Sequence, residues 1–388
     1  MGRAATATIN FDALRHNYRL AKQASNGCKA VAIVKADAYG HGAIMVARAL
    51  ANEADAFGVA CIEEAIELRD AGIKNPILLL EGFFTEDELS IISERNLWTA
   101  IHSVEQIKVL SRQRLSKPIN VWLKMDTGMH RLGIQPEDYE AAYTALKHLP
   151  QVSSVVLMTH FSCADEIINI ETASQISIFN NAIKNITAEK SLANSAGTLG
   201  HEGSHGDWQR PGIMLYGATP FSHSHKWGDQ LKSVMTLTSE VIAIHNLVKG
   251  QSVGYSKTFV CEQPTKVGTV AIGYADGYPR HAKLGTPVMV NGQRTIILGR
   301  VSMDMLAVDL TNIDNVTVGA EVELWGDKLK ASDIAMYCDT ITYTLFTGIT
   351  RRVHKVYKNI INRNSPDVTD YEDAPIPMSV KIAGTVAS

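Results

Sequence analysis

The sequence predicts an α/β protein, with an N-terminal (β/α)8 barrel followed by a smaller C-terminal β domain. Over about the first 230 residues, short apolar runs alternate with amphipathic stretches in about eight strand–helix units, the number that such a barrel needs. From Leu231 onward the segments become β-rich. A doubly wound open sheet is the alternative. A Gly-rich nucleotide loop after the first strand would favour it, and this sequence has none there.

The apolar runs are interpreted as buried parallel strands, because a sheet covered on both faces gives continuous apolar segments. These strands are predicted at residues 30–35, 57–61, 77–81, 98–101, 121–125, 155–161, 192–195 and 214–217. Helical patterns lie between them at residues 11–24, 43–54 and 63–71. Ser103 with Gln106 forms a capping pattern, and Pro136 suits a first helical position, so a helix is predicted to begin at each point.

The predicted domains are residues 1–232 for the barrel and 233–362 for the β domain. Segments 234–244, 266–275 and 287–290 have the composition of strands, and Asn291-Gly292 is a strong hairpin signal. Residues 363–388 contain three prolines and an acidic cluster, and are predicted to form an irregular tail.

Composition excludes several classes of partner. The 388 residues carry a net charge of −3 with 20% charged side chains, and no run of Lys and Arg indicates nucleic acid or an anionic membrane. No apolar run reaches the roughly 18 residues that span a bilayer, and the N-terminus lacks a signal-peptide core. The five cysteines are scattered, with neither metal-ligand nor disulfide spacing, so a cytoplasmic protein is expected.

Candidate chemistry lies at the carboxyl ends of the predicted strands, where barrel enzymes place their sites. Lys35 directly follows an apolar run, a setting in which a neutral amine could form a Schiff base. The alternative is a lysine that ends a strand and points to solvent. Further along the chain, Lys124 and Arg131, then His160, lie at other strand ends, and Arg210-Pro211-Gly212 precedes the eighth predicted strand. Converging cations with a Gly turn suit a planar anionic ligand.

These motifs resemble a known family. The stretch around Lys35, AIVKADAYGHG, is similar to the cofactor-attachment signature of bacterial alanine racemases, which use pyridoxal 5′-phosphate (PLP). The resemblance continues, in order, through LKMDTGMHRLG, MTHFSCAD, LANSAGTL, WQRPGIMLYG, SVGYSKTF, AIGYADGYPR and LGRVSMDM. It implies a PLP-binding barrel, a C-terminal β domain, a head-to-tail homodimer and interconversion of L- and D-alanine.

The resemblance also implies roles for residues. Lys35 would hold the cofactor and serve as the base on the D-face of the substrate, and Tyr255 would be the opposite base, supplied by the partner subunit. Since a tyrosine is a poor base near neutral pH unless its phenolate is stabilised, His160 and Arg210 would supply that stabilisation. Arg210 would also face the pyridine nitrogen. An arginine only donates and stays charged, so it makes the ring a weak electron sink and limits transamination. A phosphate contact is the alternative role for Arg210.

Other positions match the family's cofactor and substrate contacts. The phosphate-binding set corresponds to Tyr39, Ser195, Gly212, Ile213 and Tyr343. Arg131 would contact the cofactor's phenolic oxygen and the substrate carboxylate. Met303 and Asp304 of the partner chain would form the wall around that carboxylate. Tyr274 would narrow the entry to the site. Lys124 matches a lysine that is often carbamylated, with an ordinary ion-paired lysine as the alternative. His41, His130, Cys61 and Cys163 are interpreted as packing or loop residues.

Three other functions compete with this interpretation. A racemase of broader specificity is disfavoured because such enzymes tend to be exported. A PLP-carrier protein would lack the β domain with Tyr255 and Met303. A decarboxylase of the same fold would carry a Gly-rich phosphate motif that is missing here, and Arg210 is the wrong pyridine partner for it. The sequence leaves open whether the enzyme supplies D-alanine for peptidoglycan or L-alanine for catabolism.

Overall fold

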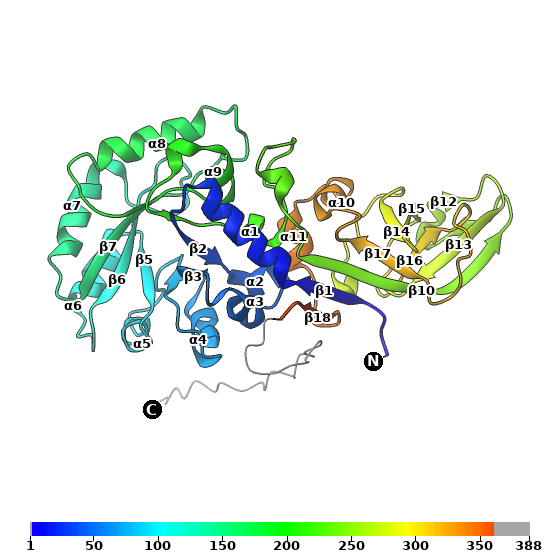
Figure 1. Ribbon diagram of the computed structural model, residues 1–388, viewed down its shortest axis with the longest axis horizontal. Helices are drawn as coiled ribbons and strands as arrows, with labels where there is room; N and C mark the ends of the chain where they lie inside the picture. The colour runs from blue at the N-terminus through cyan, green and yellow to red at the C-terminus, as the bar shows by residue number, and fades with distance from the viewer. Residues whose placement is uncertain (1, 361–388) are drawn as a thin grey trace.

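The computed structural model describes residues 2–360, which form a barrel and a β domain side by side (Figure 1). The barrel sheet has eight strands in the order β8-β7-β6-β5-β4-β3-β2-β9, and every pairing is parallel. The strands are β2 (Lys29–Ile33), β3 (Ala56–Val59), β4 (Ile77–Leu79), β5 (Trp98–Ile101), β6 (Ile119–Lys124), β7 (Val152–Met158), β8 (Lys190–Ser191) and β9 (Trp208–Gln209). The hydrogen bond from Arg210 N–H to the Ala193 carbonyl, 3.0 Å, joins the two ends of this order. The predicted barrel is thus confirmed.

Helices cover the outside of the barrel (Figure 1). They are α1 (Phe11–Ala24), α3 (Ala43–Leu50), α4 (Ile62–Asp70), α5 (Glu88–Glu94), α6 (Val104–Arg112), α7 (Pro136–Lys147), α8 (Glu171–Ala182) and the short α9 (Ser195–Gly200). The predicted starts hold at two of them: Ser103 accepts from the Gln106 N–H at the start of α6, and Pro136 is the first residue of α7.

Two predicted strands are misplaced. Residues 192–195 lie after the seventh strand, β8, which ends at Ser191. Residues 214–217 form no strand; the 3-10 helix η2 (Ile213–Tyr216) occupies this place, and the eighth strand is β9 instead. Met214, Leu215 and Tyr216 are fully buried, so their apolar run looks like a strand although it is a helical turn against α1. The true strand has only two residues before Pro211, whose missing N–H cannot extend a ladder.

The β domain is built on a second eight-stranded sheet, ordered β13-β16-β15-β14-β17-β10-β1-β18, with β13 also pairing with β10. The strands are β1 (Thr6–Asn10), β10 (Met235–Leu247), β13 (Thr265–Val270), β14 (Pro287–Val290), β15 (Gln293–Leu298), β16 (Leu306–Asp309), β17 (Glu321–Trp325) and β18 (His354–Lys358). β11 (Ser252–Val253) and β12 (Phe259–Val260) form a separate hairpin, and α10 (Ala331–Tyr337) and α11 (Thr342–Thr347) lie toward the barrel (Figure 1). The predicted β domain is confirmed, and Asn291 and Gly292 form the predicted turn, both with positive φ.

The first strand belongs to this second sheet. β1 pairs antiparallel with β10 and parallel with β18, although the boundary proposed at residue 232 assigns it to the barrel. α1 then leads directly from β1 to the outside of the barrel. The proposed tail, residues 363–388, lies outside the described residues.

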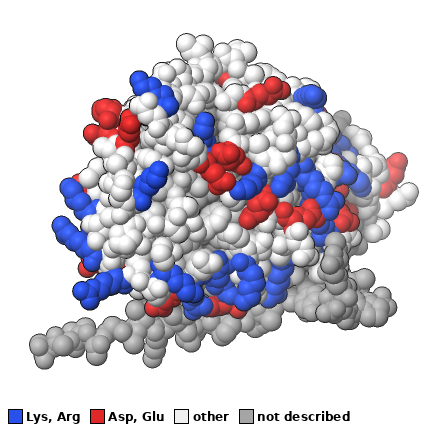
Figure 2. All heavy atoms as spheres, turned by 60° about the vertical axis from the view of Figure 1, so that its left-hand side comes forward, with Lys and Arg blue, Asp and Glu red and all other residues white. Residues whose placement is uncertain are grey.

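The surface gives no charge segregation on the face shown in Figure 2, where Lys and Arg are interspersed with Asp and Glu. Across residues 2–360, no helix combines the length and apolar character that crossing a bilayer requires.

Candidate functional site

Lys35 opens an unusual turn. β2 ends at Ile33, and α2 (Lys35–Gly40) follows with Ala36, Asp37, Ala38 and Tyr39 all at φ 52°, the left-handed region. A left-handed conformation costs a residue that carries a Cβ roughly 1–2 kcal/mol, so four in succession need compensation from their surroundings. The turn places Lys35 and Tyr39 at the carboxyl end of β2, the mouth of the barrel where catalysis is expected.

Side chains from both domains clamp this turn. Glu64 of α4 accepts the Ala36 N–H at 2.7 Å. Asp37 accepts the Ala43 N–H at 2.7 Å and forms an ion pair at 2.5 Å with Lys355 of β18. The turn is therefore held from the barrel wall on one side and from the β domain on the other.

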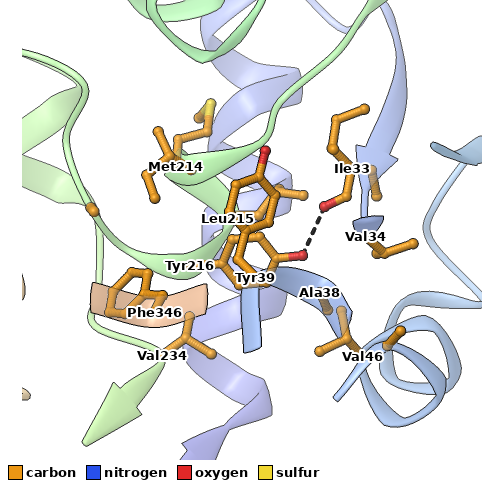
Figure 3. Packing of buried hydrophobic residues seen from close by; sticks show 14 of the residues in the cluster. Ile33, Val34, Ala38, Tyr39, Val46, Met214, Leu215, Tyr216, Val234 and Phe346 are labelled. Carbon is orange, nitrogen blue, oxygen red and sulfur yellow. Dashed lines mark hydrogen bonds between the residues drawn. The ribbon is translucent and has the colours of Figure 1, made fainter. Parts of the chain in front are cut away.

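Aromatic rings pack behind the turn (Figure 3). Tyr39 lies against Tyr216 at 4.9 Å between ring centroids, and the Tyr216 hydroxyl donates to the Ile33 carbonyl at 2.7 Å. Tyr343 of α11 lies 5.8 Å from the Tyr39 ring. Burial raises the pKa of Tyr39 above its usual range and raises that of Tyr343 to about 12, so both hydroxyls stay protonated and can donate to an anion.

A loop of backbone donors faces Tyr39. The Ser195 hydroxyl accepts the Gly212 N–H at 2.8 Å and the Met214 N–H at 3.3 Å, which fixes the turn that begins η2. A Cβ on Gly212 would lie 2.8 Å from the Tyr39 hydroxyl oxygen, so only glycine lets the two segments approach so closely. The structure thus brings together Tyr39, Ser195, Gly212, Ile213 and Tyr343, the five predicted phosphate contacts. A hollow of about 640 Å³ adjoins them, lined in part by Ile213 and Tyr343.

Arg210 is buried and forms no ion pair with a carboxylate of residues 2–360. Its two terminal nitrogens donate to the carbonyls of Ser191, Thr159 and Leu192 and to the Ser191 hydroxyl. Burial lowers its pKa to about 10, which leaves the guanidinium charged. Within residues 2–360, its Nε makes no hydrogen bond, so one fixed donor of a rigid cation remains for a ligand.

His160 is surrounded by cations. Its Nδ1 lies 3.5 Å from an Arg210 terminal nitrogen, and burial together with Arg210, Lys124, Arg131 and Lys35 holds its pKa well below the usual range. The imidazole is therefore neutral, and Nδ1 is the acceptor toward Arg210. Its other nitrogen then carries the proton.

Lys124, at the end of β6, is buried, and burial together with Arg210 and Arg131 lowers its pKa to about 8. Arg131 itself is exposed on the loop after β6, and Asp126 shapes that loop by accepting the N–H groups of Gly128 and His130. Lys35, Lys124, Arg131 and Arg210 thus converge on one imidazole. Such a cluster is costly for a protein alone and indicates an anionic ligand.

The remaining predicted residues lie in the β domain. Tyr255 begins the 3-10 turn η4 (Tyr255–Lys257) between β11 and β12 and is 70% exposed. β12 lies in the outer part of the β domain, whereas β2, which leads into Lys35, lies in the barrel (Figure 1). One chain therefore does not bring Tyr255 to Lys35. Met303 is 53% exposed on the same domain.

A buried carboxylate organises the loops that carry Tyr274, Met303 and Asp304. Asp276 is fully buried and pairs with Arg3 and Arg352, and it also accepts the Gly273 N–H at 2.9 Å. Arg3 and Arg352 in turn donate to the Asp304 carbonyl and carboxylate, at 2.9 and 2.6 Å. The sequence interpretation missed this network and Glu64, because partners up to 301 positions apart give no local pattern.

Fold and site define a two-domain barrel enzyme with a candidate anion-binding site at the mouth of the barrel. Family models of the N- and C-terminal domains of alanine racemase match residues 9–220 and 234–357. An alanine racemase of Pseudomonas syringae pv. syringae is 53% identical over 355 residues, 92% of this chain and 99% of the relative. The chain belongs to the alanine racemase family.

Two further relatives carry more specific descriptions. A Pseudomonas putida protein described as a catabolic alanine racemase is also 53% identical, over 90% of this chain and 98% of its own. A solved structure described as the biosynthetic alanine racemase of Pseudomonas aeruginosa superposes with a TM-score of 0.89 at 44% identity, over 92% of this chain and 100% of that one. Relatives of both descriptions match at least 90% of this chain, so similarity alone does not separate the two roles.

Proposed function

We propose that this protein interconverts L- and D-alanine with PLP bound at Lys35, by two bases that act from opposite faces of the substrate. One observation carries the proposal: Lys35, three other cations and a neutral imidazole lie together next to five residues suited to binding a phosphate. When bound, PLP withdraws electrons from the substrate and makes its α-hydrogen removable.

The residues fit this cofactor. Tyr39, Tyr343, Ser195 and the backbone at Gly212 and Ile213 would hold the phosphate, and Gly212 has no Cβ that would collide with the Tyr39 hydroxyl. The unpaired Nε of Arg210 would donate to the pyridine nitrogen. An arginine there cannot protonate the ring in the way a carboxylic acid does, which suits a brief deprotonation rather than transamination.

The two bases come from different chains. Lys35 would exchange the proton on the D-face, and Tyr255 of the partner subunit would exchange it on the L-face, in a homodimer that shares both sites. The neutral His160 holds a proton on Nε2, the nitrogen that does not face Arg210. Together with Arg210, it would stabilise the phenolate of Tyr255. Arg131 would contact the substrate carboxylate, and Met303 and Asp304 of the partner would close the wall beside it, with Tyr274 at the access side.

Lys124 is the candidate for carbamylation, which needs a neutral amine. Because its pKa is lowered to about 8, roughly a quarter of the amine is neutral at pH 7.5. A carbamate would place an anion among Arg131, Arg210 and Lys35. We expect a carbamate signal by NMR when the protein is equilibrated with isotopically labelled bicarbonate, and its loss as the pH falls below about 7, where the amine is protonated.

The Lys124→Arg variant is the control for this experiment. It keeps a cation at the end of β6 but cannot form a stable carbamate, so the signal should vanish. An unchanged signal in that variant would assign the modification to another lysine, and no signal in the wild type would leave Lys124 as an ordinary buried amine.

The cellular setting is part of the proposal. All five cysteines are free thiols, which fits the reducing cytoplasm. The product would be D-alanine for peptidoglycan or L-alanine for catabolism, since relatives with both descriptions match the chain.

A chiral amino-acid screen with added PLP tests the function. We expect racemisation of both alanine enantiomers, with serine as a weaker side substrate because a small pocket does not strongly reject a side chain that only adds a hydroxyl. Equal rates on basic amino acids would indicate the broad-specificity racemase instead. Stoichiometric PLP binding without turnover of any amino acid would indicate a PLP carrier.

A further inference from the structure

His41 directly follows α2, whose residues form the left-handed turn. It is fully buried, and its Nδ1 lies 2.8 Å from the Tyr39 carbonyl and 3.1 Å from the Ala38 carbonyl. Both partners are acceptors only, so Nδ1 carries the hydrogen and donates to both. The backbone N–H of His41 donates to the same Ala38 carbonyl at 3.1 Å. His41 is thus hydrogen-bonded to Ala38 and Tyr39, two of the four left-handed residues.

The other nitrogen of the His41 ring, Nε2, does not explain why a histidine occupies this position. Within residues 2–360, Nε2 is buried and has no hydrogen-bond partner, and burial lowers the pKa of the imidazole to about 4. A phenyl ring would avoid this buried, unpaired acceptor. A histidine at position 41 is therefore better explained by the N–H donor at Nδ1 than by the volume of the ring.

The ring also connects the turn to the aromatic layer behind it. Its centroid lies 4.5 Å from that of Tyr216 and 5.0 Å from that of Phe346 in α11. Tyr216 in turn packs on Tyr39, as Figure 3 shows. A shift of the imidazole would move the Tyr39 ring and the backbone that leads from Lys35 to it.

We propose that His41 is a positioning residue: its Nδ1–H fixes the Ala38 and Tyr39 carbonyls, and so holds the left-handed turn that presents Lys35 and Tyr39 to the cofactor. This inference rests on the proposed PLP site for its functional consequence. The competing role is ring packing alone, and two substitutions separate the donor from the ring.

The His41→Asn variant keeps an N–H donor near the Nδ1 position but loses the ring, whereas His41→Phe keeps a ring but loses the donor. In the protein purified without cofactor, hydrogen–deuterium exchange at the amides of residues 38–42 should be about tenfold faster in His41→Phe, the effect of one lost hydrogen bond, and closer to wild type in His41→Asn. The reverse order would establish ring packing and overturn the proposal.

The second readout compares PLP with pyridoxal, which lacks the phosphate. Since Tyr39 belongs to the phosphate-binding set, the preference for PLP over pyridoxal should fall about tenfold in His41→Phe and stay near wild type in His41→Asn. Phe179→Leu, in the buried face of α8, is the matched control, because it lowers stability without contacting the turn and should leave the preference unchanged. An unchanged preference in His41→Phe would overturn the role toward the cofactor.

The exchange measurement and the comparison of PLP with pyridoxal also allow this inference and the proposed function to fail separately. If the wild-type protein bound no PLP at all, the proposed function would fail, and the exchange measurement would still decide whether His41 holds the turn.

Discussion

Replacing Lys35 by alanine should abolish racemisation of alanine, with a loss of about 10⁴-fold or more, because the variant loses both the covalent attachment of PLP and one of the two bases. The side chain lies at the mouth of the barrel, before a turn that is clamped by Glu64 and Lys355. We expect no borohydride-stable adduct in the variant, whereas digestion of the reduced wild-type protein should give a labelled peptide that contains Lys35.

Lys124→Ala is a useful comparison, since it removes another amine of the same cationic cluster. It should keep the borohydride adduct on Lys35 and lose activity less severely. If reduction labels Lys124 or another lysine in the wild-type protein, the cofactor has been placed at the wrong residue.

The second large effect is expected for Tyr255→Phe. Racemisation should fall by roughly 10²–10⁴-fold, the usual contribution of a positioned acid or base, while the absorbance of the bound cofactor stays intact. Because Lys35 would still act on its own face, the variant should exchange the α-hydrogen of D-alanine in heavy water without forming L-alanine. Proton NMR of the substrate measures this exchange, and wild-type racemisation by the variant would refute the two-base assignment.

Mixing the two inactive variants tests whether sites are shared between chains. A hybrid dimer of Lys35→Ala and Tyr255→Phe subunits would contain one site with both intact bases and one with neither. Random reassociation should then restore about a quarter of wild-type activity, because half of the dimers are hybrids with one working site of two. No recovery, with hybrid formation verified, would place Tyr255 and Lys35 in the same chain's site.

Much of the fold could be predicted because its signals are local. Apolar runs located β2 through β7, and the Ser103 and Pro136 signals located two helix starts. The eighth strand could not be found, because two paired residues are too short to give a pattern and the longer apolar run that follows is a buried helical turn. β1 was assigned to the barrel because nothing in five residues reveals which sheet they join.

The site was predictable to the extent that parallel strands bring their ends together. Lys124 ends β6, His160 follows β7 and Arg210 follows β9, and the barrel gathers the three at one mouth. The left-handed turn after Lys35 could not be predicted, since alanine, aspartate and tyrosine all disfavour positive φ. Long-range contacts impose it, as they also assemble Arg3, Asp276 and Arg352. Placement of Tyr255 at the site remains a prediction from the family resemblance.

The pairing of β1 between β10 and β18 has a consequence for biosynthesis and for dissection of the protein. The barrel is inserted within the second sheet, whose first and last strands are the two ends of the described chain. During synthesis, about 350 further residues must be added after β1 before β18 can hydrogen-bond to it. A fragment that begins at residue 233 would lack β1, the strand that pairs with both β10 and β18, and would leave both strands free to pair with other chains.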